Sequence, residues 1–112
     1  MNRNKLIEVF ISNLANTIVH QILEKAAFDR PEKAEGYNKE FTNSWELAKR
    51  YREKINPINR SLPDKDIQKI KTKIANKVNT ELKLRISKGY QNINLTLVEE
   101  FVDKVLIEMK VI

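Results

Sequence analysis

Apolar residues recur every three or four positions along most of this chain, which is the spacing of one face of an α-helix. The pattern predicts four helices, over about residues 4–28, 33–55, 62–88 and 96–110. A loosely alternating stretch at residues 90–95 is too short to make a sheet alone, so we expect a loop there. The length of 112 residues suits one compact domain. The sequence therefore predicts a single all-α domain over residues 1–112, either a four-helix bundle or an irregular helical bundle.

The first predicted helix is apolar around most of its circumference. Apolar residues occupy two neighbouring positions in nearly every turn between residues 6 and 27, and Asn13, Asn16, His20 and Glu24 take the remaining side. A helix of this kind belongs in the centre of a bundle or at an interface between two copies of the chain. The second arrangement gives one candidate function, a structural or adaptor protein that acts through homodimerisation or protein–protein contacts of the apolar first helix.

Proline, glycine and short polar residues mark the ends of the predicted helices. Pro31 and Pro57 follow the first and second helices, because the residue before a proline disfavours helical conformation. Gly89 stands where a left-handed C-cap of the third helix is expected. Two patterns predict capping boxes at the starts of the third and fourth helices, Ser61 with Asp64 and Thr96 with Glu99.

The composition excludes several kinds of chemistry. The chain has no cysteine, a single histidine and two glycines, so disulfide frameworks, thiolate metal sites, two-histidine metal sites and glycine-rich phosphate loops cannot form. His20 and Glu24 are one turn apart, but no second histidine or nearby carboxylate completes a metal or acid–base site, and we expect a solvated pair. We therefore predict no catalytic residue, no cofactor and no metal.

An acidic motif lies on the fourth predicted helix. Glu99, Glu100 and Asp103 form the pattern E-E-x-x-D, which is similar to the first magnesium-binding motif of the all-α nucleoside triphosphate pyrophosphatases. That family needs a second carboxylate pair on a later helix, and only nine residues follow Asp103 here. The resemblance is limited to these positions, so it implies half of a metal site and no enzyme.

The basic residues are concentrated in the middle of the chain. The net charge is +6, yet residues 49–88 hold 13 basic and 4 acidic side chains, while the two flanking segments are slightly acidic. Lysines that recur every four residues on one helix can each meet a backbone phosphate. The candidate nucleic-acid contacts in this segment are Lys49, Arg50, Arg52, Lys69, Lys73 and Lys77.

Two other interpretations of these residues remain open at this stage. The lysines can simply form a solvated face, or be compensated by acidic residues of a neighbouring helix such as Glu100 and Asp103. Tyr51, between Arg50 and Arg52, can stack on a base, although a tyrosine at the rim of a helical core is the commoner arrangement. Trp45 is in register with other apolar positions, so we expect it in the core.

We expect a small basic, soluble, non-enzymatic binding module that contacts a nucleic-acid backbone or a nucleoprotein assembly through residues 49–88. The alternative is the structural or adaptor protein described above. No run of 18 uninterrupted apolar residues predicts a membrane helix, and we expect a cytoplasmic protein. The partners predicted are RNA, DNA or another acidic surface, together with a second copy of the chain if the first helix pairs.

Overall fold

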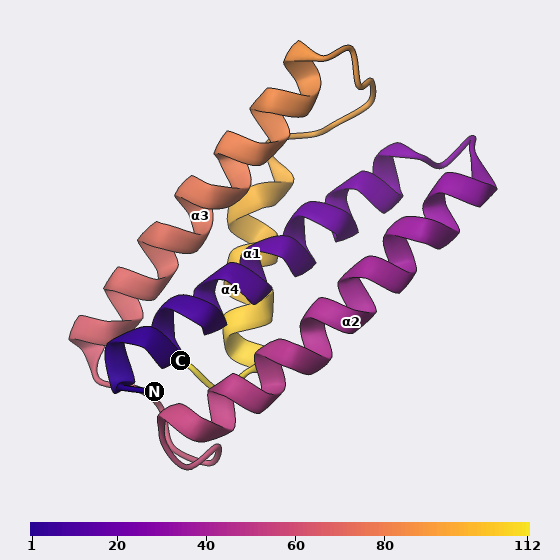
Figure 1. The fold of residues 1–112 in the computed structure, drawn as a ribbon. Helices are drawn as coiled ribbons and strands as arrows, with labels where there is room; N and C mark the ends of the chain where they lie inside the picture. Colours follow the sequence, from indigo (N-terminus) through magenta and orange to yellow (C-terminus); the bar gives the residue numbers. More distant parts are fainter.

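Four α-helices and their connecting loops make up the whole chain, with no strand (Figure 1). The computed structural model describes residues 1–112. The helices are α1 (Arg3–Ala26), α2 (Pro31–Ile55), α3 (Asp64–Ser87) and α4 (Leu97–Glu108). All four predicted helices are confirmed, and each end lies within two residues of its expected position. The all-α fold class is confirmed with them.

Helix α1 is the central element of the fold. It contacts α2, α3 and α4, whereas α2 and α3 flank it and make no contact with each other. Helix α4 crosses α1 at a steep angle and also packs against α3 (Figure 1). The molecule is elongated along α1, α2 and α3, with extents of 40, 23 and 22 Å.

The wide apolar face of α1 is covered by the other three helices of the same chain. The residues of α1 that the core buries are Ile7, Phe10, Ile11, Leu14, Ala15, Ile18, Val19, Ile22, Leu23 and Ala26. Burying a large aliphatic side chain contributes about 1.5–3 kcal/mol, so this set is a main source of stability. The expected central position is confirmed, and a second copy of the chain is not needed to shield α1.

Helix α1 is also long and apolar enough to cross a lipid bilayer by length and composition. Its most apolar window is more than half buried within the fold. A core helix meets the same criterion, and in this fold α1 occupies the core position. The buried polar residue of α1 is satisfied within the helix, because the Thr17 hydroxyl donates to the carbonyl of Asn13 at 2.9 Å.

An ion pair joins the starts of α1 and α3. Arg3 Nη2 lies 2.5 Å from Asp66 Oδ2, and the Asp66 side chain is largely shielded while that of Arg3 is half exposed. The hydrogen bond from Arg3, assisted by its charge, lowers the pKa of Asp66 below its ordinary value. The pair links the first turn of α1 to the first turn of α3.

The sequence predicted the cap at the C-terminal end of α3 correctly and the cap at its N-terminal end incorrectly. Gly89 has φ +98°, and the N–H groups of Gly89 and Tyr90 donate to the carbonyls of Ile86 and Arg85 at 3.0 and 3.1 Å. The predicted glycine cap is thus confirmed as a Schellman motif. The predicted capping box is wrong, because α3 begins at Asp64 after an extended Pro63, which leaves Ser61 three residues before the helix.

The second predicted capping box, at the start of α4, is also wrong. No side chain caps this helix, although Thr96 occupies the N-cap position. The backbone N–H and the hydroxyl of Thr96 both donate to Asn94 Oδ1, at 3.0 and 2.5 Å. This local turn takes the hydroxyl that the capping box required, which is a competition typical of Asx turns.

Candidate nucleic-acid interface

Lys69, Lys73 and Lys77 lie one turn apart on α3, and all three are exposed. The apolar side of the same helix packs into the core through Ile70, Ile74, Val78 and Leu82. An α-helix rises 1.5 Å per residue, so successive lysines are about 6 Å apart along its axis. No carboxylate oxygen lies within 4.0 Å of any of the three ammonium groups. We call these three residues the lysine row.

Two of the predicted contacts on α2 are exposed but lie apart from the lysine row. Lys49 Nζ is 3.9 Å from Glu46 Oε1, and Arg50 forms no ion pair. Helix α1 separates α2 from α3, as Figure 1 shows. The structure therefore does not bring the basic residues of segment 49–88 together on one surface.

The prediction that Arg52 contacts nucleic acid is wrong. Its side chain is fully buried, and it is the largest of the fully buried side chains. The guanidinium donates from Nε to the carbonyl of Met109 at 2.9 Å, and from Nη2 to the carbonyls of Arg60 and Lys110 at 2.6 and 2.7 Å. Nη1 donates to the carbonyl of Asn56 at 3.3 Å and to its side-chain Oδ1.

All the acceptors of Arg52 are oxygen atoms without a formal charge. Met109 and Lys110 follow the end of α4, and Asn56 follows the end of α2, where helix carbonyls carry partial negative charge. Lys110 adopts φ +56° as the N–H of Val111 donates to the carbonyl of Leu106 at 2.9 Å. Burial lowers the pKa of Arg52. Arg52 thus joins α2, the loop after it and the segment after α4, and is unavailable to a phosphate.

The acidic residues of α4 do not neutralise the lysine row. Asp103 Oδ1 lies 2.9 Å from Lys71 Nζ, on the side of α3 that faces α4. This contact raises the pKa of Lys71 by hydrogen bonding and by opposite charge. Glu100 is exposed and takes part in no ion pair. Across the α3–α4 contact, a carboxylate therefore neutralises the charge of Lys71 only. Lys69, Lys73 and Lys77 have no carboxylate partner.

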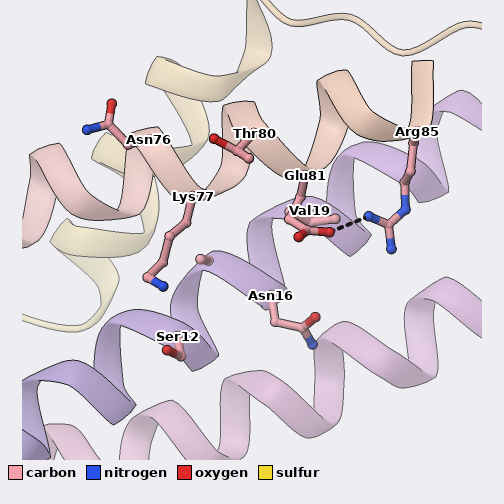
Figure 2. Close-up of a pocket in the computed structure, with 9 residues that line it drawn as sticks. Ser12, Asn16, Val19, Asn76, Lys77, Thr80, Glu81 and Arg85 are labelled. Carbon is pink, nitrogen blue, oxygen red and sulfur yellow. Dashed lines mark hydrogen bonds and ion pairs between the residues drawn. The ribbon is translucent and has the colours of Figure 1, made fainter. Parts of the chain in front are cut away.

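A polar groove runs between α1 and α3 at the end of the lysine row. Its volume is about 560 Å³, and Lys77 is one of its lining residues (Figure 2). The buried Ala15 and Val19 contribute apolar surface, and the remaining lining residues are polar or charged: Ser12, Asn16, Asn76, Thr80, Glu81 and Arg85. We call this feature the α1–α3 groove.

The single carboxylate of the α1–α3 groove is held by an arginine. Arg85 Nη1 donates to Glu81 Oε2 at 2.8 Å, as the dashed line in Figure 2 shows. The Lys77 side chain extends from α3 toward α1 in the same view. The groove therefore combines a neutralised acid, a free ammonium group and several uncharged hydrogen-bonding groups.

Of the groove residues, Lys77 alone was predicted from the sequence. Ser12 with Asn16 on α1, and Asn76 with Thr80 on α3, are each one helical turn apart. Such pairs of uncharged polar residues were the only signal available in the sequence. That the two pairs line one groove depends on how α1 packs against α3, which the local pattern does not encode.

The lone histidine and its neighbour form no site together. His20 Nδ1 donates to the carbonyl of Asn16 at 2.8 Å, while Glu24 Oε2 accepts from Asn38 Nδ2 at 2.8 Å. The expected His20–Glu24 pair is therefore replaced by separate contacts. The ring of His20 lies 6.0 Å from that of Tyr37, centroid to centroid, which joins α1 to α2.

The two aromatic residues near the basic end of α2 pack against the core. Tyr51 is half-buried, with Lys54 Nζ 5.1 Å from its ring centroid, so the interpretation as a residue at the core rim is confirmed. Trp45, which was expected in the core, is half-buried against the core instead. Neither ring lies in the α1–α3 groove.

The acidic motif of α4 does not gather ligands. Asp103 is paired with Lys71, and Glu99 and Glu100 are exposed. No group of three or more His, Asp or Glu side chains is close enough to hold a metal ion. The second carboxylate pair that the pyrophosphatase resemblance requires has no counterpart in this fold.

Comparison with known proteins adds no relative to this description. No protein-family model matches the chain, and neither a curated protein nor a solved structure matches it significantly.

Proposed function

We propose that this chain is a non-enzymatic binding module that holds the phosphate backbone of a nucleic acid along α3. The observation that carries the proposal is the lysine row, three exposed lysines one turn apart with no carboxylate within ion-pair distance. Of the four other basic residues of the same helix, Lys71 is paired with Asp103 and Arg85 with Glu81. Lys65 and Lys83 are exposed and form no ion pair.

An unpaired row of like charges costs the isolated protein a little stability. Lysines at i and i+4 repel each other by about 0.2–0.5 kcal/mol per pair. A polyanion along the row removes this repulsion and releases the counterions condensed on its phosphates. The row therefore favours a ligand with regularly repeated negative charge over a small anion that contacts one lysine.

Binding of this kind has recognisable properties. Contacts to phosphate carry no base information, so we expect weak sequence preference and a steep loss of affinity as salt rises. Because α2 lies on the far side of α1, Lys49 and Arg50 belong to a different surface and contribute through net charge alone.

Matched charge-removal variants test the proposal. The first replaces Lys69, Lys73 and Lys77 by glutamine, and the second replaces Lys49, Arg50 and Lys54 by glutamine, so each removes three positive charges from one helix. Affinity for a fluorescent 20-mer nucleic acid is measured by anisotropy at low salt. We expect a large loss in the α3 variant and a small one in the α2 variant. Equal losses would show that net charge alone drives binding, and no binding by the unmodified protein would overturn the proposal.

A further inference from the structure

The α1–α3 groove lies directly beside the surface on which we place the nucleic acid. Lys77 is both the last residue of the lysine row and part of the groove lining. A strand whose phosphates follow Lys69 and Lys73 therefore passes the groove when it reaches Lys77. Whatever the strand presents next to its phosphates meets the groove side chains shown in Figure 2.

The groove offers uncharged groups that both donate and accept hydrogen bonds. Ser12, Asn76 and Thr80 make no side-chain hydrogen bond within the chain. Asn16 uses Nδ2 to donate to Ser44 Oγ, which leaves its Oδ1 as an acceptor. Groups of this type can both donate to and accept from a hydroxyl, whereas a phosphate oxygen can only accept.

The interface has no aromatic side chain for base stacking. Helix α3 contains no aromatic residue, and none lines the groove. Proteins that bind single strands rely on such stacking, and proteins that bind double-stranded RNA rely on contacts to phosphate and to the ribose 2′-hydroxyl. Free lysines beside unused amide and hydroxyl groups fit the second combination.

We propose that the nucleic acid held along α3 is duplex RNA, with its phosphates on the lysine row and ribose 2′-hydroxyls at the α1–α3 groove. This inference rests on the proposed function and narrows it to one substrate class. In this arrangement Lys77 contacts a phosphate at the rim of the groove. Asn76 and Thr80 on α3 line one side of the groove, Ser12 and Asn16 on α1 line the other, and these four side chains bind the sugar edge.

The first test compares nucleic acids on the unmodified protein. Four 20-mers of one sequence are used at equal salt: duplex RNA, duplex DNA, single-stranded RNA and duplex RNA methylated at every 2′-oxygen. We expect duplex RNA to bind about tenfold more tightly than duplex DNA, equivalent to one or two neutral hydrogen bonds. The methylated duplex, which lacks the hydroxyl donor but remains base-paired, is expected to bind with an affinity close to that of DNA.

The second test uses paired variants of α3. Asn76→Ala with Thr80→Val removes two groove side chains, and Thr72→Val with Asn79→Ala removes the same residue types outside the groove lining. The groove variant is expected to lose the preference for duplex RNA while it keeps its affinity for duplex DNA. The control variant is expected to keep both, and circular dichroism verifies that each variant is folded.

The outcomes separate this inference from the proposed function. Equal affinity for duplex RNA and duplex DNA, or tighter binding of single-stranded RNA, overturns the inference and leaves backbone binding along α3 intact. Unchanged affinity for the methylated duplex likewise overturns it, without relying on a variant. Failure to bind any of the four nucleic acids at low salt overturns the proposed function, and the inference with it.

Discussion

Replacing Arg52 by methionine is expected to lower the free energy of unfolding by about 2–4 kcal/mol. Methionine keeps much of the aliphatic volume of arginine, so the change removes hydrogen-bond donors without opening a large cavity. The guanidinium donates five hydrogen bonds to oxygens of Asn56, Arg60, Met109 and Lys110. None of these acceptors carries a formal charge, so the substitution leaves no buried carboxylate behind.

The magnitude follows from where those acceptors lie. The bond to the Met109 carbonyl is buried, and a buried acceptor that loses a charged donor costs about 1–3 kcal/mol. The other four bonds are partly buried, so water replaces the donor in part and each loss is about 0.5 kcal/mol. Removing a buried charge restores some solvation energy, which we take as ~1 kcal/mol. The sum is large against the ~5–15 kcal/mol of total stability usual for a domain.

The assay is urea unfolding, followed by far-ultraviolet circular dichroism and by fluorescence of the single tryptophan, Trp45. Arg50→Met is the control, because Arg50 is exposed two residues away on α2 and its loss is expected to change stability by less than about 0.5 kcal/mol. Arg52→Lys should lie between, since an ammonium group keeps the charge but not the planar fork. If the Arg52→Met and Arg50→Met proteins unfolded within about 1 kcal/mol of each other, the account of Arg52 would be refuted.

Three further predictions concern helix ends and ion pairs. Lys110→Gly should raise the urea midpoint by the equivalent of about 0.5–1 kcal/mol, because Lys110 has φ +56°, where glycine is unstrained; an unchanged or lower midpoint would contradict this. Arg3 lowers the pKa of Asp66, so the ion pair stabilises the fold at pH values above the ordinary carboxyl pKa. This stabilisation is lost as the pH falls through the lowered pKa of Asp66. Asp66→Asn should therefore make the free energy of unfolding depend less steeply on pH in the acid range. Asp103 raises the pKa of Lys71, so this ion pair stabilises the fold below the ordinary lysine pKa and the stabilisation is lost as the pH rises through the raised pKa. Lys71→Met should therefore make the free energy of unfolding depend less steeply on pH in the alkaline range. An unchanged alkaline dependence would exclude this pair as the cause of it.

The four helices were predictable because the apolar face of each one appears in the sequence as a local period. Each apolar stripe repeats every three or four residues, and that spacing survives whatever tertiary packing follows. The glycine cap at Gly89 was predictable for a similar reason, since a positive φ suits glycine wherever the chain turns. The capping box at Thr96 failed because its hydroxyl has another acceptor in Asn94, and the one at Ser61 failed because α3 begins three residues later.

The spacing of apolar residues on α2 indicated that Arg52 is buried, but it was predicted to lie at the surface. Its position continues the apolar spacing of α2 through Phe41, Trp45, Ala48 and Ile55, which places it on the side of the helix that faces the core. Charged residues are rarely buried, so the sequence favoured exposure. The acceptors that permit burial include carbonyls 57 and 58 residues away, and no local pattern reveals them.

The α1–α3 groove could not be predicted from local sequence patterns. Ser12 and Asn16 are distant in sequence from Asn76 and Thr80, and only the packing of α1 against α3 places them around one groove. The lysine row itself was predicted, because its four-residue spacing is local. Its lack of a carboxylate partner is a tertiary property, set by Asp103 pairing with Lys71.

The most direct test of the central claim is the salt dependence of nucleic-acid binding. Affinity for duplex nucleic acid is measured at several salt concentrations for the unmodified protein and for the variant with Lys69, Lys73 and Lys77 replaced by glutamine. Each neutralised phosphate contributes a slope of about −0.9 to the plot of log affinity against log salt. We therefore predict a slope of about −2.7 or steeper for the unmodified protein, reduced in magnitude by about 2.7 in the variant. A slope that is the same in both proteins would contradict the claim that the lysine row holds the phosphate backbone.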